Sequence, residues 1–156
     1  MRVLYLIRHA RPVSPEGAQS DFDRPLSPVG RIEAEKIAAV LSAEQLTHPF
    51  VLSSPAARAR ETAEIVVATN HWSANFESRI YEAAPQTLLD VIGRIDSANE
   101  VVLLFGHNPG VEKLLRYFTG EIRAMPTAGV AKLELAIDAW RDCADASARL
   151  DWLISP

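Results

Sequence analysis

Cysteine is nearly absent from this sequence, whose 156 residues include only Cys143. A single cysteine excludes a disulfide within the chain and a metal site built from several cysteines. Long hydrophobic runs are lacking as well, because Arg8 interrupts the apolar stretch that begins at residue 3, and no small-residue cleavage site follows. Such a stretch is too short to span a membrane. We therefore expect a protein of the cytoplasm, a reducing compartment, with no membrane partner.

A surplus of basic charge is also missing. Sixteen Lys and Arg residues stand against twenty Asp and Glu residues, which leaves a net charge of −4. A general nucleic-acid-binding protein is usually basic, so we expect no nucleic-acid partner. Hydrophobic residues make up 48% of the chain, which is enough for a core and excludes disorder by composition. The length predicts a single domain over residues 1–156.

Strand and helix patterns alternate along the chain. Continuous apolar runs typical of buried strands occur at 3–7, 50–53 and 101–105, with a weaker candidate at 76–81. Alternating runs at 130–137 and 149–154 predict half-exposed strands at one side of a sheet. Helix start signals precede apolar stripes at Ser27-Pro28, Ser54-Pro55, Pro85 and Asn108-Pro109. This alternation predicts an α/β fold, a three-layer sandwich whose mostly parallel central sheet is flanked by helices.

Arginine and histidine residues occur where three of the expected strands end. Arg8 and His9 end the first strand, Arg58 lies one turn into the helix after the second, and His107 ends the third. Parallel strands would bring these four side chains to one edge of the sheet, beside helix N-termini that attract anions. We therefore expect an anion site. Phosphate fits the arginine forks best, although sulfate or carboxylate would use similar groups.

The two histidines suggest chemistry beyond binding. A neutral imidazole is a nucleophile that can accept a phosphoryl group, while arginines hold the phosphoryl oxygens. The leaving oxygen needs a proton, so a general acid is expected nearby. Glu82 is the candidate, because it lies between the weak strand and the helix that begins at Pro85.

Four motifs carry a family resemblance: LIRHA at 6–10, DRPLSPVG at 23–30, SSPAARARET at 53–62 and LLFGHNPG at 103–110. In this order they resemble the histidine phosphatase superfamily, which has the phosphoglycerate-mutase-like fold. Within it, the match is closest to the small SixA-type phosphohistidine phosphatases. The resemblance covers nearly the whole chain and implies one histidine phosphatase domain. Ala10 stands where glycine is often found, a small residue typical of the SixA-type branch.

The resemblance also implies roles for individual residues. His9 would be the nucleophile that becomes phosphorylated. Phosphate-binding roles would fall to Arg8, Arg24, Arg58 and His107, and more weakly to the amide of Asn108. Glu82 lies near the place of the acid in larger members, an alignment that the motifs do not fix. The family needs no metal and no organic cofactor.

The chain has no room for a lid domain between these motifs, whereas mutases and small-sugar phosphatases of the superfamily usually carry such insertions. A shallow site suits a phosphorylated protein, such as a phosphohistidine domain. Three alternatives stay open: a phosphatase of a small phosphorylated metabolite, a non-catalytic phosphate-recognition module, and a mutase.

Simpler interpretations also stand beside the functional ones. In these interpretations, Arg58 only pairs with Glu61 or Glu64 on its helix, Arg24 only anchors its loop, and Glu82 is an exposed carboxylate. His48 and His71 are expected in solvent. A metal site made of two histidines and a glutamate is disfavoured, because the histidine spacing does not suit it and the arginines would repel a cation.

Overall fold

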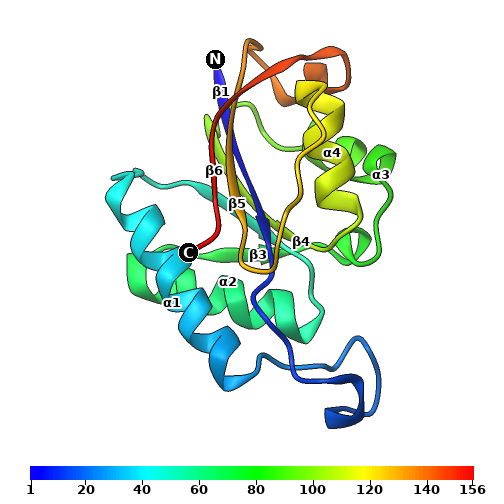
Figure 1. Ribbon diagram of the computed structural model, residues 1–156. Coiled ribbons are helices and arrows are strands. Elements are labelled where there is room, and N and C mark those ends of the chain that lie inside the picture. Colours follow the sequence, from blue (N-terminus) through cyan, green and yellow to red (C-terminus); the bar gives the residue numbers. More distant parts are fainter.

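Parallel pairing of buried strands builds the centre of a six-stranded sheet. The computed structural model describes residues 1–156 and orders the strands β3-β2-β4-β1-β5-β6 (Figure 1). Their bounds are β1 Arg2–Arg8, β2 Phe50–Ser53, β3 Ala74–Phe76, β4 Val101–Gly106, β5 Val130–Leu135 and β6 Ala148–Ile154. The four strands β3, β2, β4 and β1 run parallel, and β5 and β6 complete one side as antiparallel strands.

Helices cover both faces of this sheet. They are α1 Pro28–Ala43, α2 Ala57–Asn70, α3 Pro85–Gly93 and α4 Gly110–Thr119. Helices α1 and α2 pack together on one face, and α3 and α4 pack together on the other (Figure 1). The predicted three-layer α/β sandwich is therefore confirmed. None of the helices combines the length and the apolar character needed to cross a membrane.

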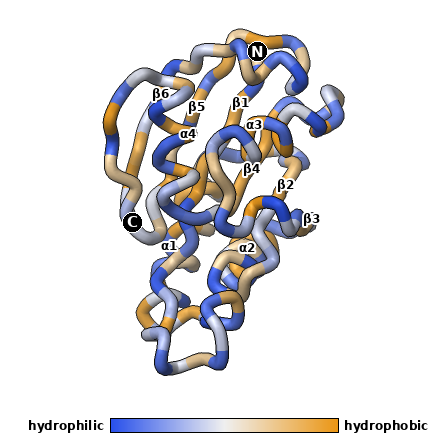
Figure 2. Tube along the Cα trace, turned by 90° about the vertical axis from the view of Figure 1, so that its right-hand side faces the viewer, coloured by the Kyte–Doolittle hydropathy of each residue, from blue (hydrophilic) through white to orange (hydrophobic).

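The central strand β1 explains why the core has two halves. Its side chains alternate between the two faces of the sheet. Tyr5 and Ile7 join the cluster that faces α1 and α2, while Leu4 and Leu6 join the cluster that faces α3 and α4. All four are fully buried. Hydrophobic colour runs along the central strands in Figure 2, as expected for strands covered on both faces.

Three local expectations differ from the structure. The weak strand expected at 76–81 is instead the end of β3 followed by a short 3₁₀ helix, Ser78–Ile80. The second helix begins at Ala57, because the Ser54 side chain turns toward His107 instead of capping the helix. A 3₁₀ helix over Trp140–Asp145, which no periodic pattern indicated, covers the end of α3.

The loop over residues 11–28 is fixed at its base. Pro12 and Leu26 form a single bridge between the two arms of the loop. Ser27 caps α1 as predicted, accepting a hydrogen bond from the Gly30 N–H at 3.0 Å and donating its own to the Arg11 carbonyl. Gly30 is required here, because a Cβ atom at this position would lie 2.0 Å from the Arg11 oxygen. The loop therefore leaves the sheet in one defined direction.

Candidate active site

The strand register brings the expected side chains to one edge. Arg8 is paired with Gly106, and Ser53 with Phe105, so β1, β2 and β4 end at the same level. The rings of His9 and His107 lie 5.2 Å apart between their centroids, and the Arg58 Nε donates to His9 Nε2 at 3.3 Å. All three side chains are buried. Residues separated by about a hundred positions thus form one cluster.

His9 presents a lone pair to this cluster. Its Nδ1 lies 2.7 Å from the carbonyl oxygen of Ala10, which accepts hydrogen bonds only, so the ring hydrogen lies on Nδ1. The unprotonated Nε2 accepts the N–H of Arg58. The pKa of His9 is lowered to about 4, chiefly by burial; the Ala10 hydrogen bond opposes this shift, and the charges of the nearby arginines add to it. His9 is therefore a neutral imidazole with Nε2 available as a nucleophile.

Two buried polar atoms beside His9 have no partner in the protein: Nδ1 of His107 and Nε of Arg8. The Arg8 side chain is held by its Nη1, which donates to the Met125 carbonyl at 3.0 Å. Burial also lowers the pKa of His107 to about 3, with His9 and Arg58 as the next causes. Buried polar groups are rarely left unpaired in proteins. Oxygens of a bound oxyanion would satisfy both atoms.

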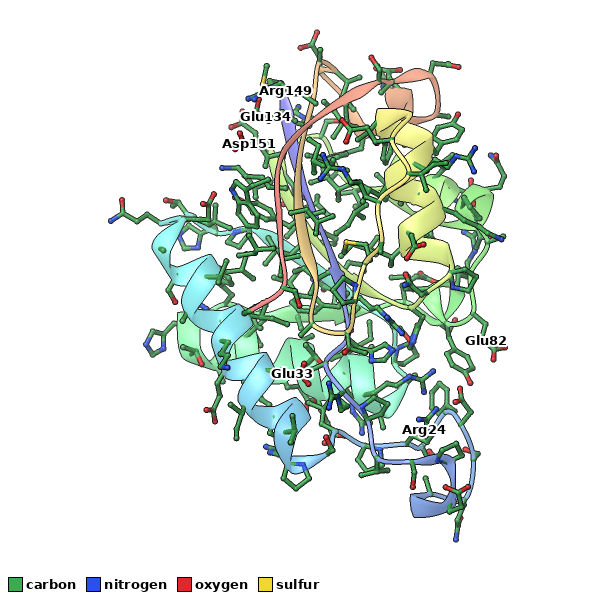
Figure 3. All side chains as sticks on the ribbon, in the orientation of Figure 1. Arg24, Glu33, Glu82, Glu134, Arg149 and Asp151 are labelled. Atoms are coloured by element: carbon green, nitrogen blue, oxygen red, sulfur yellow. The ribbon has the colours of Figure 1, made fainter.

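A cavity of about 470 Å³ opens next to the two histidines and is lined by Arg58, Glu82, Ala83, Ala84, His107, Asn108, Pro109, Gly110 and Lys113. Glu82 is exposed and has a left-handed backbone, with φ of 53°. Figure 3 labels it on the segment that leads to α3. Glu82 is one of the residues that line the cavity. The structure therefore places this candidate acid at the mouth of the site.

Asp21 is the residue that sequence reasoning missed. The Arg58 guanidinium donates to the Asp21 main-chain oxygen at 2.7 Å and to its carboxylate at 3.0 Å. The same carboxylate accepts hydrogen bonds from Tyr81 and Arg24. The Tyr81 hydrogen bond, followed by those of the two arginines, holds the pKa of Asp21 far below its usual range. An ionised Asp21 thus fastens the 11–28 loop over Arg58.

This contact overturns the surface interpretation of Arg58, which pairs with neither Glu61 nor Glu64. Arg31 approaches Glu61 at 3.4 Å, and Arg60 approaches Glu64 at 3.7 Å, as expected for exposed residues on these helices. The only sequence signal for Asp21 was its place three residues before Arg24 in a polar loop. Asp23 lies in the same loop, and its carboxylate bonds to Ser20 instead.

Arg24 and Asn108 are engaged elsewhere. Arg24 donates two hydrogen bonds to the Val13 carbonyl and one to Asp21, so it anchors the 11–28 loop, on which Figure 3 labels it. Its charge nevertheless contributes to the lowered pKa of His9. The Asn108 amide donates to Glu112 and to the Met125 carbonyl, which uses both of its hydrogens. Asn108 lines the cavity without a free donor.

The structure also bears on the metal-site alternative and on the two remaining histidines. No group of three or more His, Cys, Asp and Glu side chains is arranged to hold a metal ion, so His9, His107 and Glu82 do not form one. His48 and His71 are exposed, as predicted. Both lie in turns at the opposite end of β2 and α2 from the cluster.

The fold and the cluster define a class: an α/β sandwich with buried histidine and arginine side chains gathered at the carboxyl ends of parallel strands. Residues 4–88 match the family described as the histidine phosphatase superfamily, branch 1. The chain belongs to this superfamily. The family motifs and the structural neighbours support phosphatase activity.

Individual relatives agree with this assignment. An uncharacterized protein of Mycobacterium tuberculosis is 33% identical over 141 residues, covering 83% of this chain and 87% of that protein. The structure of SixA from Agrobacterium tumefaciens, a protein assigned as a phosphohistidine phosphatase, shares 30% identity with a TM-score of 0.84 and covers 99% of this chain and 98% of that one. SixA from Nakamurella multipartitia, with the same assignment, shares 26% identity with a TM-score of 0.86, covering 99% and 96%.

The buried neutral histidines predict a pH-dependent stability. Unfolded histidine binds a proton near pH 6.5, whereas the pKa of His9 is about 4 and that of His107 about 3. Protons therefore favour the unfolded chain below pH 6.5, and stability is lost as the pH falls toward 4. Urea denaturation should show a loss of roughly 1.5 kcal/mol per histidine between pH 6.5 and pH 5.

A variant with both buried histidines replaced by glutamine should lose much less stability over this range. The matched variant with His48 and His71 replaced should behave like the wild type, because those side chains are exposed. Equal pH dependence in all three proteins would contradict neutral, buried imidazoles.

Replacing Asp21 by asparagine should weaken the loop. The substitution removes the negative charge between Arg24 and Arg58 and leaves an amide that cannot accept all three side-chain hydrogen bonds. We expect the free energy of unfolding to fall by about 1 kcal/mol, at the low end for charged hydrogen bonds because the Asp21 side chain is 45% exposed. Chemical denaturation measures this, with Asp23→Asn as the control. Equal losses in both variants would argue against the Asp21 contact.

Proposed function

We propose that the protein is a metal-independent phosphatase that forms a phosphohistidine on Nε2 of His9. The observation that supports this most directly is the His9 hydrogen-bond pattern, in which Nδ1 donates to the Ala10 carbonyl and Nε2 keeps its lone pair. Arg58 donates to this nitrogen, the His107 ring lies 5.2 Å away between centroids, and Arg8 and His107 each have a buried polar atom without a partner. A nucleophile surrounded by oxyanion donors is what phosphoryl transfer requires.

The reaction would proceed in two displacements. In the first, His9 Nε2 attacks phosphorus, a P–N bond forms, and the bond to the leaving group breaks with its electron pair. The leaving group takes a proton from an acid or, if it is an imidazole, departs readily. In the second, water attacks phosphorus, the P–N bond breaks, and inorganic phosphate leaves while His9 regains its neutral form. Arg8, Arg58 and His107 would hold the equatorial oxygens in both steps.

Glu82 is proposed as the group that protonates the leaving oxygen and then accepts a proton from water. Glu82 lines the cavity and is exposed, so a carboxyl group at this position would exchange protons with solvent and would lie close to a substrate bound in the cavity. A general acid contributes most when the leaving group is a strong base.

A phosphohistidine on a protein is the proposed substrate. Two SixA structures assigned as phosphohistidine phosphatases share this fold over nearly their whole length. The segments between the four motifs are also too short to hold an inserted lid domain. A small phosphorylated metabolite is the second candidate. The observation in its favour is the cavity of about 470 Å³, a size common among pockets for small molecules.

The central experiment is to trap the intermediate. Wild-type protein should hydrolyse an aryl phosphate equally well with and without a chelator, and acid-sensitive labelled phosphate should map to His9 after rapid quenching. His9→Ala should abolish both, because it removes the proposed nucleophile. His48→Ala is the matched control, since that histidine is exposed and remote from the site. Wild-type protein that binds phosphate without turnover would show a recognition module instead.

Glu82→Gln tests the acid. We expect a loss of roughly a hundredfold in kcat on an alkyl phosphate and little loss on an aryl phosphate or phosphohistidine, whose leaving groups need no proton. Glu77→Gln is the control, because Glu77 lies on the same segment and lines a different cavity. An equal loss on every substrate would show that Glu82 is not the acid.

A further inference from the structure

Ser54 makes a buried contact with His107 that the proposed mechanism does not yet use. Its Oγ lies 2.8 Å from His107 Nε2, and Ser54 is fully buried. The same Oγ accepts the Ala56 N–H at 3.2 Å. A hydroxyl has one hydrogen to donate, and His107 Nε2 is the one acceptor within its reach. The Ser54 O–H therefore donates to Nε2.

The direction of this hydrogen bond decides the tautomer of His107. A neutral imidazole whose Nε2 accepts a hydrogen bond carries its own hydrogen on Nδ1. Nδ1 is the buried atom of His107 that lacks a partner. The Nδ1–H tautomer leaves one buried group of this pair without a partner, the Nδ1 hydrogen. The opposite tautomer would leave two, because the Ser54 hydrogen would lack an acceptor and the Nδ1 lone pair would lack a donor. The protein thus stabilises Nδ1–H.

We propose that Ser54 is a positioning residue that fixes His107 as an uncharged hydrogen-bond donor to the phosphoryl group. This inference rests on the proposed phosphatase function. It explains how two neutral histidines take opposite roles: the Ala10 carbonyl directs the lone pair of His9 toward phosphorus, and the Ser54 hydroxyl directs a hydrogen of His107 toward a phosphoryl oxygen.

The sheet holds the serine in place for this role. The Ser54 N–H donates to the Phe105 carbonyl at 3.1 Å, just beyond the last paired residues of β2 and β4. His107 follows β4 by one residue. The hydroxyl and the ring therefore project from the ends of adjacent strands, and the hydrogen bond to Phe105 holds the Ser54 backbone at that edge.

Nitrogen NMR of histidine-labelled protein without ligand tests the tautomer directly. At pH 7 the wild type should show a protonated Nδ1 and an unprotonated Nε2 on His107. Ser54→Ala should reduce the protonated Nδ1 signal, and Ser54→Thr, which keeps the hydroxyl, should restore it. Ser53→Ala is the matched control, because Ser53 is equally buried and bonds only to the Ser54 carbonyl. A protonated Nε2 in the wild type would overturn the inference even if no variant folds.

Kinetics supply the second readout. Ser54→Ala should lower kcat on an aryl phosphate by about tenfold to a hundredfold with a small change in KM, because the lost donor acts mainly on the charge that develops during transfer. Inhibition by vanadate, which mimics that state, should weaken more than inhibition by phosphate. An unchanged kcat, or equal weakening of both inhibitors, would overturn the role of Ser54. Failure to trap phosphate on His9 would refute the proposed function separately, because the NMR result does not depend on turnover.

Discussion

The in-register parallel pairing of β4 with β1 and β2 is the constraint on which the rest of the structure depends. It aligns three strand ends, so that His9, His107 and the start of the helix carrying Arg58 meet without any long side chain reaching across the molecule. Backbone hydrogen bonds supply this alignment, and the two apolar clusters on either face hold the sheet flat against its helices. The positions of His9 and His107 are therefore set by the same sheet that forms the core.

Electrostatics then divides the roles within the cluster. Arginine charges and burial act in the same direction on both imidazoles and keep them neutral, while the carboxylate of Asp21 offsets part of the positive charge. Because neutral histidines differ only in which nitrogen carries hydrogen, their neighbours assign their functions. A main-chain carbonyl does so for His9 and a serine hydroxyl for His107. Membership of the histidine phosphatase superfamily agrees with such a site.

The 11–28 loop connects stability to the site. Ser27 and Gly30 fix its base, Arg24 braces it through the Val13 carbonyl, and Asp21 attaches it to Arg58. The guanidinium of Arg58 thus has three of its hydrogens engaged with His9 and Asp21, which restricts its orientation before any ligand arrives. Preorganisation of this kind lowers the cost of binding an oxyanion.

The sequence alone determined the layers and most of the strand and helix positions, because apolar periodicity and proline start signals act over a few positions. The residues at the strand ends also predicted the convergence of Arg8, His9, Arg58 and His107. Tertiary structure decided what depends on distant partners. Arg58 meets Asp21 across 37 residues, and His107 meets Ser54 across 53. It also decided that Arg24 donates to the Val13 carbonyl and to Asp21, and that Asn108 donates to the Met125 carbonyl and to Glu112. Glu82, in contrast, is one of the residues that line the cavity. Hydrogen-bond partners of this kind are fixed by the packed sheet edge, and no local pattern encodes them.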